Sequence, residues 1–316
     1  MIKRAIVSGA TGAVGMALLE ELTARHIEVL VLCRAEGRFA RIPQHPLITC
    51  KTCALTDLGT LPNDTGKSYD AFFHLAWNGT AGAARHDTAL QLENVHTTLG
   101  AVDAAHRFGC RVFVGAGSQA EYGRHSHALT TTTPAYPESA YGMAKLAAGH
   151  FSRLLAELHQ MRHVWVRILS VYGPYDSDGS LITNTTRLLL NGSTPTLTAG
   201  EQIWDYLYSR DAAKALYLLG DCGKHGIAYP LGSGHARPLR HYVEALRDAI
   251  EPSAALEFGQ LPYSPAQVMH LRADISALRA DTGWQPETDF AEGVRKTVQF
   301  VRESDRAHAL CLATTN

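Results

Sequence analysis

Apolar residues in the first half of the chain alternate between two spacings, and each spacing predicts a different element. Short continuous apolar runs, such as EVLVLC at 28–33, are typical of strands buried on both faces of a sheet. Apolar residues three and four apart predict the helices between them. The expected strands are 3–8, 28–33, 47–51, 71–75, 111–115 and 163–168, and the expected helices are 13–25, 87–108 and 140–160. This alternation predicts an α/β protein with a doubly wound parallel sheet.

The pattern becomes irregular after residue 168. Gly, Pro, Ser and Thr punctuate residues 172–200, and the helices expected at 209–219, 239–250 and 290–303 are separated by loops. We therefore expect a first domain at 1–168 and a smaller domain formed mainly by 169–316, with part of 203–232 returning to the first. Ligands of doubly wound sheets bind beyond the carboxyl ends of the strands, where the Gly9 loop and residues 76–79 and 116–123 would meet.

Composition and charge exclude several classes of protein. Lys plus Arg (29) nearly balances Asp plus Glu (30) over 316 residues, so no overall field favours binding to nucleic acid or to an anionic membrane. The first residues enter a strand without a signal-peptide pattern, and no apolar run approaches about 20 residues, so we expect a soluble, cytoplasmic protein. Cys50 and Cys53 form a CxxC, but a zinc ribbon needs a second such pair, and the sixteen histidines show no metal-binding cluster, so we expect no metal.

A glycine-rich turn between the first strand and the first helix is the first candidate site. In this arrangement Gly9 permits a tight turn, Gly12 lets the backbone approach a pyrophosphate at the helix N-terminus, and Gly15 lets the helix pack closely on the sheet. The turn therefore predicts a dinucleotide site whose residues are Gly9, Thr11, Gly12, Ala13, Val14 and Gly15.

The end of the second strand indicates which dinucleotide is bound. NAD sites usually carry Asp or Glu here for the adenosine ribose, but this chain has Arg34, followed by Arg38. Because arginine suits a 2′-phosphate, we favour NADP(H); NAD(H) is the alternative if both arginines are surface residues. Asp57 and Leu58, after the third strand, are candidates for holding the adenine, although a helix-capping aspartate would give the same pattern.

Tyr141 and Lys145 lie four residues apart on an expected helix, so the ammonium group can lie near the phenol. A phenol with the ordinary pKa of ~10 acts as a base near pH 7 only if positive charge stabilises the phenolate. Lowering that pKa by ~3 units corresponds to about 4 kcal/mol. Ser118, at the end of an expected strand, would hydrogen-bond the same substrate oxygen. These three residues form the candidate catalytic set.

Together the motifs resemble those of the extended short-chain dehydrogenase/reductases, and within them the NAD(P)-dependent nucleotide-sugar epimerases, dehydratases and ketoreductases. The resemblance runs in order along nearly the whole chain and is carried by SGATGAVG, HLAW, ENV, GSQAEYG, YGMAK, RILSVYGP, WDYLYSRD and ADISALRADTGWQP. It implies a Rossmann domain with a C-terminal substrate-binding domain, and a homodimer formed through helices 87–108 and 140–160. The cofactor contacts that it implies, beyond those above, are Leu75, Ala76, Trp77, Asn94, Tyr141, Lys145 and Ile168.

Departures from the family pattern bear on the substrate. Dehydratases of this group follow the catalytic Ser or Thr with Asp-Glu, whereas Gln119 and an alanine stand here, which disfavours dehydration; Glu121 is an alternative acid. Two arginines that usually hold a diphosphate are replaced by Trp204 and Ser264, unless Arg187, Arg210, Arg237 or Arg272 takes over. The candidate substrate residues are Trp77, Ser118, Gln119, Glu121, Ser170, Arg187, Trp204 and Arg210.

These expectations favour an NADPH-dependent 4-ketoreductase acting at C4 of a nucleotide-activated deoxysugar. A 4-epimerase with tightly bound NAD is the nearest alternative, because it uses the same three catalytic residues. A non-catalytic NAD(P)-binding regulatory protein is an alternative from another class. The missing diphosphate arginines leave open the reduction of a small non-sugar ketone.

Overall fold

A seven-stranded parallel sheet forms the centre of the computed structural model, which describes residues 1–34 and 41–314, with side chains described as far as residue 306. The strands lie in the order β10 (Ala228–Leu231), β6 (Arg162–Ile168), β5 (Val112–Ser118), β4 (Ala71–His74), β1 (Arg4–Ser8), β2 (Glu28–Cys33) and β3 (Ile48–Thr52). Every neighbouring pair is parallel. The predicted doubly wound sheet is therefore confirmed.

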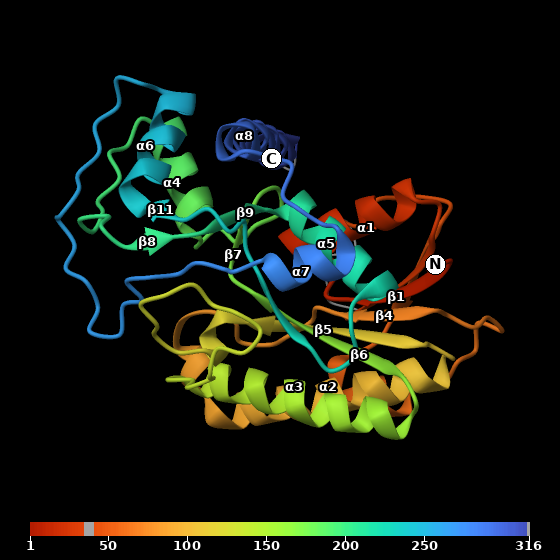
Figure 1. The fold of residues 1–316 in the computed structure, drawn as a ribbon. Coiled ribbons are helices and arrows are strands. Elements are labelled where there is room, and N and C mark those ends of the chain that lie inside the picture. Colours follow the sequence, from red (N-terminus) through yellow and green to blue (C-terminus); the bar gives the residue numbers. More distant parts are fainter. Residues whose placement is uncertain (35–40, 315–316) are drawn as a thin grey trace.

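Helices cover both faces of this sheet (Figure 1). On one face lie α2 (Thr88–Arg107) and α3 (Ala140–Leu158); on the other lie α1 (Ala13–Ala24) and α5 (Ser209–Cys222), with the short α7 (Ser276–Thr282) beside α5. Successive side chains of a strand point to opposite faces. Val7 accordingly packs into the core under α1, while its neighbour Ile6 packs into the core under α2.

A smaller group of elements carries the C-terminal core. It contains α4 (Leu181–Leu190), α6 (Leu239–Ile250) and α8 (Phe290–Thr314), with the short strands β7 (Ser170–Tyr172), β8 (Ile203–Trp204), β9 (Tyr206–Tyr208) and β11 (Arg237–Pro238). Tyr172, Ile182 and Val298 pack together in this core. The expectation of an irregular segment over 172–200 was wrong at α4, because the threonines and asparagine of LITNTTRLLL interrupt its apolar spacing.

The chain crosses back to the sheet after β9. Helix α5 packs against α1, and β10 joins the edge of the sheet beside β6. The domain boundary at residue 168 remains a prediction. In the part of the chain that the structure describes, no helix is both long and apolar enough to cross a membrane.

The strand order creates a gap where the chain changes direction. Because β1 lies between β2 and β4, the chain continues from β1 to α1 on one face of the sheet and from β4 to α2 on the other, and folds of this kind bind ligands at this point of the carboxyl edge. Gly9 in the first loop has φ +78°, and a Cβ there would lie 2.5 Å from the backbone nitrogen of Ala76 in the second. The two loops therefore approach closely only because residue 9 is glycine.

Candidate active site

A groove of about 490 Å³ runs along the carboxyl edge of the sheet. Of the predicted cofactor residues, Gly9, Thr11, Gly12, Arg34, Leu58, Leu75, Ala76 and Trp77 line it. Its other walls come from residues that the sequence analysis did not assign: Ala10, Leu32, Cys33, Cys53, Leu55, Asn78 and Thr80. The groove thus combines the glycine-rich loop, the end of β2 and the loop after β4.

The glycine-rich loop has the geometry that a pyrophosphate requires. Gly12 is the N-cap of α1, and a Cβ added to it would meet nothing within 4 Å, so its face is open to the groove. Among the described residues no side chain caps this helix, which leaves its N-terminal N–H groups to an anion. A Cβ at Gly15 would lie 2.3 Å from the Gly9 carbonyl oxygen, so glycine is required there for packing. The site fits a dinucleotide.

Among the described residues that line the groove, Arg34 is the charged one. Arg34 follows β2 and lines the groove, whereas Arg38 lies outside the described residues. Leu55 and Leu58 form an apolar wall from the 3-10 turn η2 (Leu55–Thr60). Asp57 lies on the same turn, but its exposed side chain is not part of the wall, and its role in holding adenine remains a prediction.

The loop after β4 is fastened to α2 by two buried amides. Asn94 accepts from the backbone N–H of Asn78 at 2.9 Å and donates to its carbonyl oxygen at 2.9 Å. Gln91 accepts from Trp77 Nε1 at 2.8 Å and donates to two carbonyl oxygens of the same loop. Asn94 therefore shapes the groove through Asn78, and Gln91, which the sequence analysis missed, fixes the indole of Trp77.

Ser118, Tyr141 and Lys145 meet in one buried site. Ser118 ends β5, while Tyr141 and Lys145 stand one helical turn apart at the start of α3. Burial raises the pKa of the Tyr141 phenol above its ordinary value, and a hydrogen bond with Ser118 and the charge of Arg85 act in the opposite direction. The raised pKa keeps the phenol protonated at neutral pH, with Ser118 within hydrogen-bond reach of it.

Lys145 is turned toward the interior of the site. Its Nζ donates to the Ala116 carbonyl oxygen at 2.6 Å and lies 3.8 Å from the centroid of the Trp77 ring. Burial lowers the pKa of Lys145 to about 7, against an opposing attraction from Glu121. His74 lies close by, and burial together with the Lys145 charge lowers its pKa to about 3, so that it is neutral at working pH.

The prediction that Glu121 contacts the substrate or acts as a displaced acid is wrong. Its carboxylate is completely buried and accepts from the Ser118 backbone N–H at 2.7 Å, from Trp165 Nε1 at 3.0 Å and from Arg167 Nε at 2.7 Å. These hydrogen bonds hold the Glu121 carboxylate beneath the site, where it fixes the backbone of Ser118. Gln119 is the next residue on the 3-10 turn η4 (Gln119–Glu121) and remains a predicted substrate contact.

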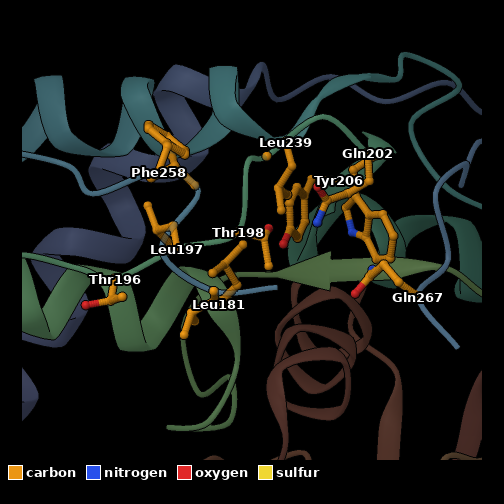
Figure 2. Close-up of a pocket in the computed structure, with 13 residues that line it drawn as sticks. Leu181, Thr196, Leu197, Thr198, Gln202, Tyr206, Leu239, Phe258 and Gln267 are labelled. Atoms are coloured by element: carbon orange, nitrogen blue, oxygen red, sulfur yellow. The ribbon is translucent and has the colours of Figure 1, made fainter. Parts of the chain in front are cut away.

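A second cavity of about 270 Å³ lies between α4, α6 and the short strands (Figure 2). Its walls are largely apolar and aromatic, with Leu181 and Leu239 from the helices and Trp204 and Tyr206 from the strands. Gln202 and Gln267 add neutral polar groups. Trp204 also packs on the cluster that contains Tyr122, next to η4. As far as the described residues go, no charged side chain lines this cavity.

The arginines considered as replacements for the diphosphate ligands line neither the groove nor the second cavity. Arg187 pairs with Asp178 at 2.8 Å and with Asp305 at 3.3 Å, and Arg210 borders a separate hollow beside α1. Arg237 lies over the Tyr242 ring, and Arg272 donates to a backbone carbonyl. The substrate contacts of Arg187 and Arg210 remain predictions.

The remaining predicted residues lie near the site without lining either cavity. Ser170 begins β7 and pairs in register with Tyr206, a wall of the second cavity. Ile168 ends β6 and packs on the sheet core, while Ala13 and Val14 open α1. Among the described residues, no group of three or more His, Cys, Asp or Glu side chains is placed to hold a metal ion.

Comparison with known proteins agrees with this geometry. A model described as the NAD dependent epimerase/dehydratase family matches residues 5–232. The chain belongs to that family. A curated relative, the dTDP-glucose 4,6-dehydratase of Shigella flexneri, is 31% identical over 180 residues, an alignment that covers 54% of this chain and 50% of the relative. The chain therefore matches about half the length of such relatives.

Solved structures of similar fold include epimerases. The UDP-N-acetylglucosamine 4-epimerase of Methanobrevibacter ruminantium, in complex with UDP-N-acetylmuramic acid, gives a TM-score of 0.86 at 23% identity over 96% of this chain and 99% of that one. The UDP-glucose 4-epimerase of Thermus thermophilus, in complex with NAD, gives 0.83 at 25% identity over 95% and 99%. The fold of this epimerase/dehydratase-family chain is thus one that holds a dinucleotide in a solved relative.

Arg85 and Trp165 of this family member also escaped the sequence analysis, although they touch the catalytic set or its support. The Arg85 guanidinium, on the 3-10 turn η3 (Gly82–His86), lies 4.3 Å from the centroid of the Tyr141 ring. Trp165 fills the space left by three glycines and donates to Glu121. The sequence did hold a signal for Trp165, because Gly115, Gly117 and Gly149 stand inside buried elements and indicate that a large side chain packs against them. It held no such signal for Arg85.

Proposed function

We propose that this chain is an NADPH-dependent 4-ketoreductase acting at C4 of a nucleotide-activated deoxysugar. The observation that carries the proposal is the buried set of Ser118, Tyr141 and Lys145 beside a groove that fits a dinucleotide. Family membership and the nucleotide-sugar names of the relatives support this substrate class. NADPH, when bound, supplies the hydride; the proton comes from this chain.

The chain's own residues account for the proton transfer. Ser118 and Tyr141 both reach the carbonyl oxygen of the substrate, and the Tyr141 phenol, kept protonated by burial, donates its proton as negative charge develops there. Lys145 stabilises the resulting phenolate. The reductive direction is supported by Arg34, which suits NADPH, and by Gln119 and Ala120 in place of the Asp-Glu pair that elimination requires.

The test is consumption of NADPH with an NDP-4-keto-6-deoxyhexose. The wild type should consume NADPH in proportion to the sugar product. Tyr141→Phe should bind NADPH normally and lose at least 100-fold in rate, which is a typical contribution of a general acid (about 10² to 10⁴). If the protein consumes no NADPH with any of several ketosugars that differ in nucleotide base and in configuration, the reductase is excluded.

The same experiment separates the epimerase alternative. An epimerase would carry NAD through purification, release it on denaturation and interconvert 4-epimers without net cofactor turnover. A regulatory binding protein would bind cofactor with no turnover at all, and Tyr141→Phe would leave its biological activity intact. Homodimer formation is proposed with the function, because the family resemblance places α2 and α3 at a dimer interface.

One observation favours a second candidate, the reduction of a ketone that carries no diphosphate. The cavity containing Trp204 and Tyr206 has neutral walls, whereas a diphosphate is normally bound by cations. A ketone of aromatic or alicyclic character would match those walls better. Parallel assays with a nucleotide-linked 4-ketosugar and with an uncharged cyclic ketone of similar size distinguish the two candidates.

A further inference from the structure

The face of the Tyr141 ring is covered by a cation that the predicted catalytic set does not include. The Arg85 guanidinium lies 4.3 Å from the ring centroid, and Lys145 Nζ lies 5.9 Å from it. The edge of the Trp77 ring meets Tyr141 with the centroids 6.1 Å apart. The phenol thus has Arg85 closer to its ring than Lys145.

The position of Lys145 makes this difference matter. Its ammonium group donates to the Ala116 carbonyl oxygen and lies over the face of the Trp77 ring, and burial lowers its pKa well below the ordinary value of a lysine. A guanidinium, in contrast, keeps its charge at every pH at which enzymes work. Arg85 therefore places a second positive charge beside Tyr141, closer to the ring than Lys145.

The fold fixes Arg85 in this position. Its Nη1 donates to the Thr80 carbonyl oxygen at 3.2 Å. The buried amide of Gln91 donates to the carbonyl oxygens of Gly79 and Ala84 at 2.9 Å each, which anchors both ends of the segment that precedes Arg85. The arginine is held over the ring by the same amide that orients Trp77.

We propose that Arg85 is a positioning residue for the reaction, which stabilises the phenolate of Tyr141 from the ring face and shares this role with Lys145. A cation over an aromatic face is attracted by the ring, and the attraction grows when the phenol becomes negative. The other groups that face Tyr141 are Ser118 from β5, Glu121 from η4 and Trp77 from the β4 loop, while His74 faces Lys145. Of these, Glu121 is anionic and opposes the phenolate. The proposal rests on Tyr141 being the acid-base group of the proposed reductase.

The first measurement needs no substrate. Uniform incorporation of 3-fluorotyrosine, whose phenol ionises at lower pH, allows the Tyr141 resonance to be titrated by fluorine NMR and assigned by its loss in Tyr141→Phe. In the NADP⁺ complex, Arg85→Gln should raise the titration midpoint by about one pH unit, a tenfold loss of phenolate at a given pH. Arg85→Lys should restore most of the shift. Arg25→Gln is the matched control, because Arg25 covers the Tyr217 ring at 4.1 Å far from the site.

The second measurement uses turnover. In the oxidative direction, which needs the phenolate, Arg85→Gln should lower kcat about tenfold near neutral pH, with the loss recovered as pH rises and with the Kd for cofactor unchanged. An unchanged titration midpoint in Arg85→Gln overturns the proposal even if the enzyme turns over. A change in KM alone would also overturn it and make Arg85 a substrate ligand. If no substrate is turned over, the proposed function fails while the NMR titration still decides the role of Arg85.

Discussion

Arg34 is the residue on which the choice between NADP(H) and NAD(H) depends. It is exposed at the end of β2 and lines the cofactor groove, so a 2′-phosphate placed there gains a charge-assisted hydrogen bond. Such a bond is worth about 1.5–3 kcal/mol, or a factor of about 10 to 100 in Kd. We expect Arg34→Ala to weaken NADPH binding by that factor and to leave NADH binding unchanged, as measured by calorimetry.

A matched control for Arg34 stands at the other end of the sheet. Arg4 begins β1, away from the carboxyl edge, and Arg4→Ala removes the same charge from the molecule. It should change neither affinity. Equal weakening of NADPH and NADH by Arg34→Ala would show that the arginine supports the loop rather than the 2′-phosphate.

The protonation of Tyr141 sets the expected pH dependence. Burial raises the pKa of its phenol, so the proton that reduction requires is present throughout the neutral range and is lost only as pH rises through that raised pKa. The reductive kcat should therefore stay level through neutral pH and fall in the alkaline range, while the oxidative kcat should rise with pH. Steady-state rates measured in both directions against pH, with Tyr141→Phe as the baseline, check the direction of this pH dependence. A reductive rate that climbs with alkalinity would mean that another group donates the proton.

At the scale of elements, Trp165 is one of the residues through which α3 packs on the sheet. Trp165 on β6 lies against Gly149 on α3, where an added Cβ would come within 2.8 Å of its Cε2 atom. Alanine is favoured over glycine in a helix by about 1 kcal/mol, but overpacking a close contact costs about 1–3 kcal/mol. We expect Gly149→Ala to lower the free energy of unfolding by about 1 kcal/mol, measured by urea denaturation.

A double-mutant cycle isolates the cause of that loss. In a Trp165→Leu background the space beside Gly149 is open, and Gly149→Ala should then be neutral or stabilising by its helix propensity. If the alanine costs the same in both backgrounds, the tryptophan is not what limits residue 149.

Elements with strong local signals were predictable from the sequence, and those whose signal is diluted were not. The buried run EVLVLC gave β2 with its observed ends, because a strand covered on both faces is apolar throughout. Strand β5 extends to Ser118 rather than ending at 115, since GAGS carries no β-branched residue and reads as a turn. Helix α4 was missed because its buried side chains include three threonines, which look polar in a hydrophobicity pattern.

The residues of the candidate site likewise fall into those that the sequence could predict and those that it could not. The glycine loop, Ser118, Tyr141 and Lys145 have fixed local spacings that express their geometry, so they could be found in the sequence. The contacts of Arg85 with Tyr141 and of Glu121 with Arg167 join segments far apart in the chain, and no periodicity reports them. Glu121 was misassigned for this reason, because its motif shows a carboxylate but not the tryptophan and arginine that bury it.

For the whole molecule, the outer face of α2 and α3 is the clearest candidate for an interface. These helices lie side by side on one face of the sheet (Figure 1) and leave large apolar side chains exposed: Leu92, Met143, Phe151, Leu154 and Leu158, with Leu158 79% exposed. Contiguous exposed apolar surface on a globular protein marks an interaction site. A second copy of the chain, packed through the same two helices about a two-fold axis, would bury this face on both sides.

We expect the wild type to sediment as a dimer and Phe151→Asp to sediment as a monomer in analytical ultracentrifugation. The aspartate would place two uncompensated charges in an apolar interface, since a two-fold contact contains each substitution twice. Met269→Asp is the matched control, because Met269 is also an exposed apolar residue but lies outside α2 and α3 and lines neither cavity. Because α3 carries Tyr141 and Lys145 at its inner end, the monomer should also lose part of its catalytic rate while its cofactor affinity is kept. A wild type that is monomeric at assay concentrations, or a Phe151→Asp variant that stays dimeric, would place the interface elsewhere or remove it.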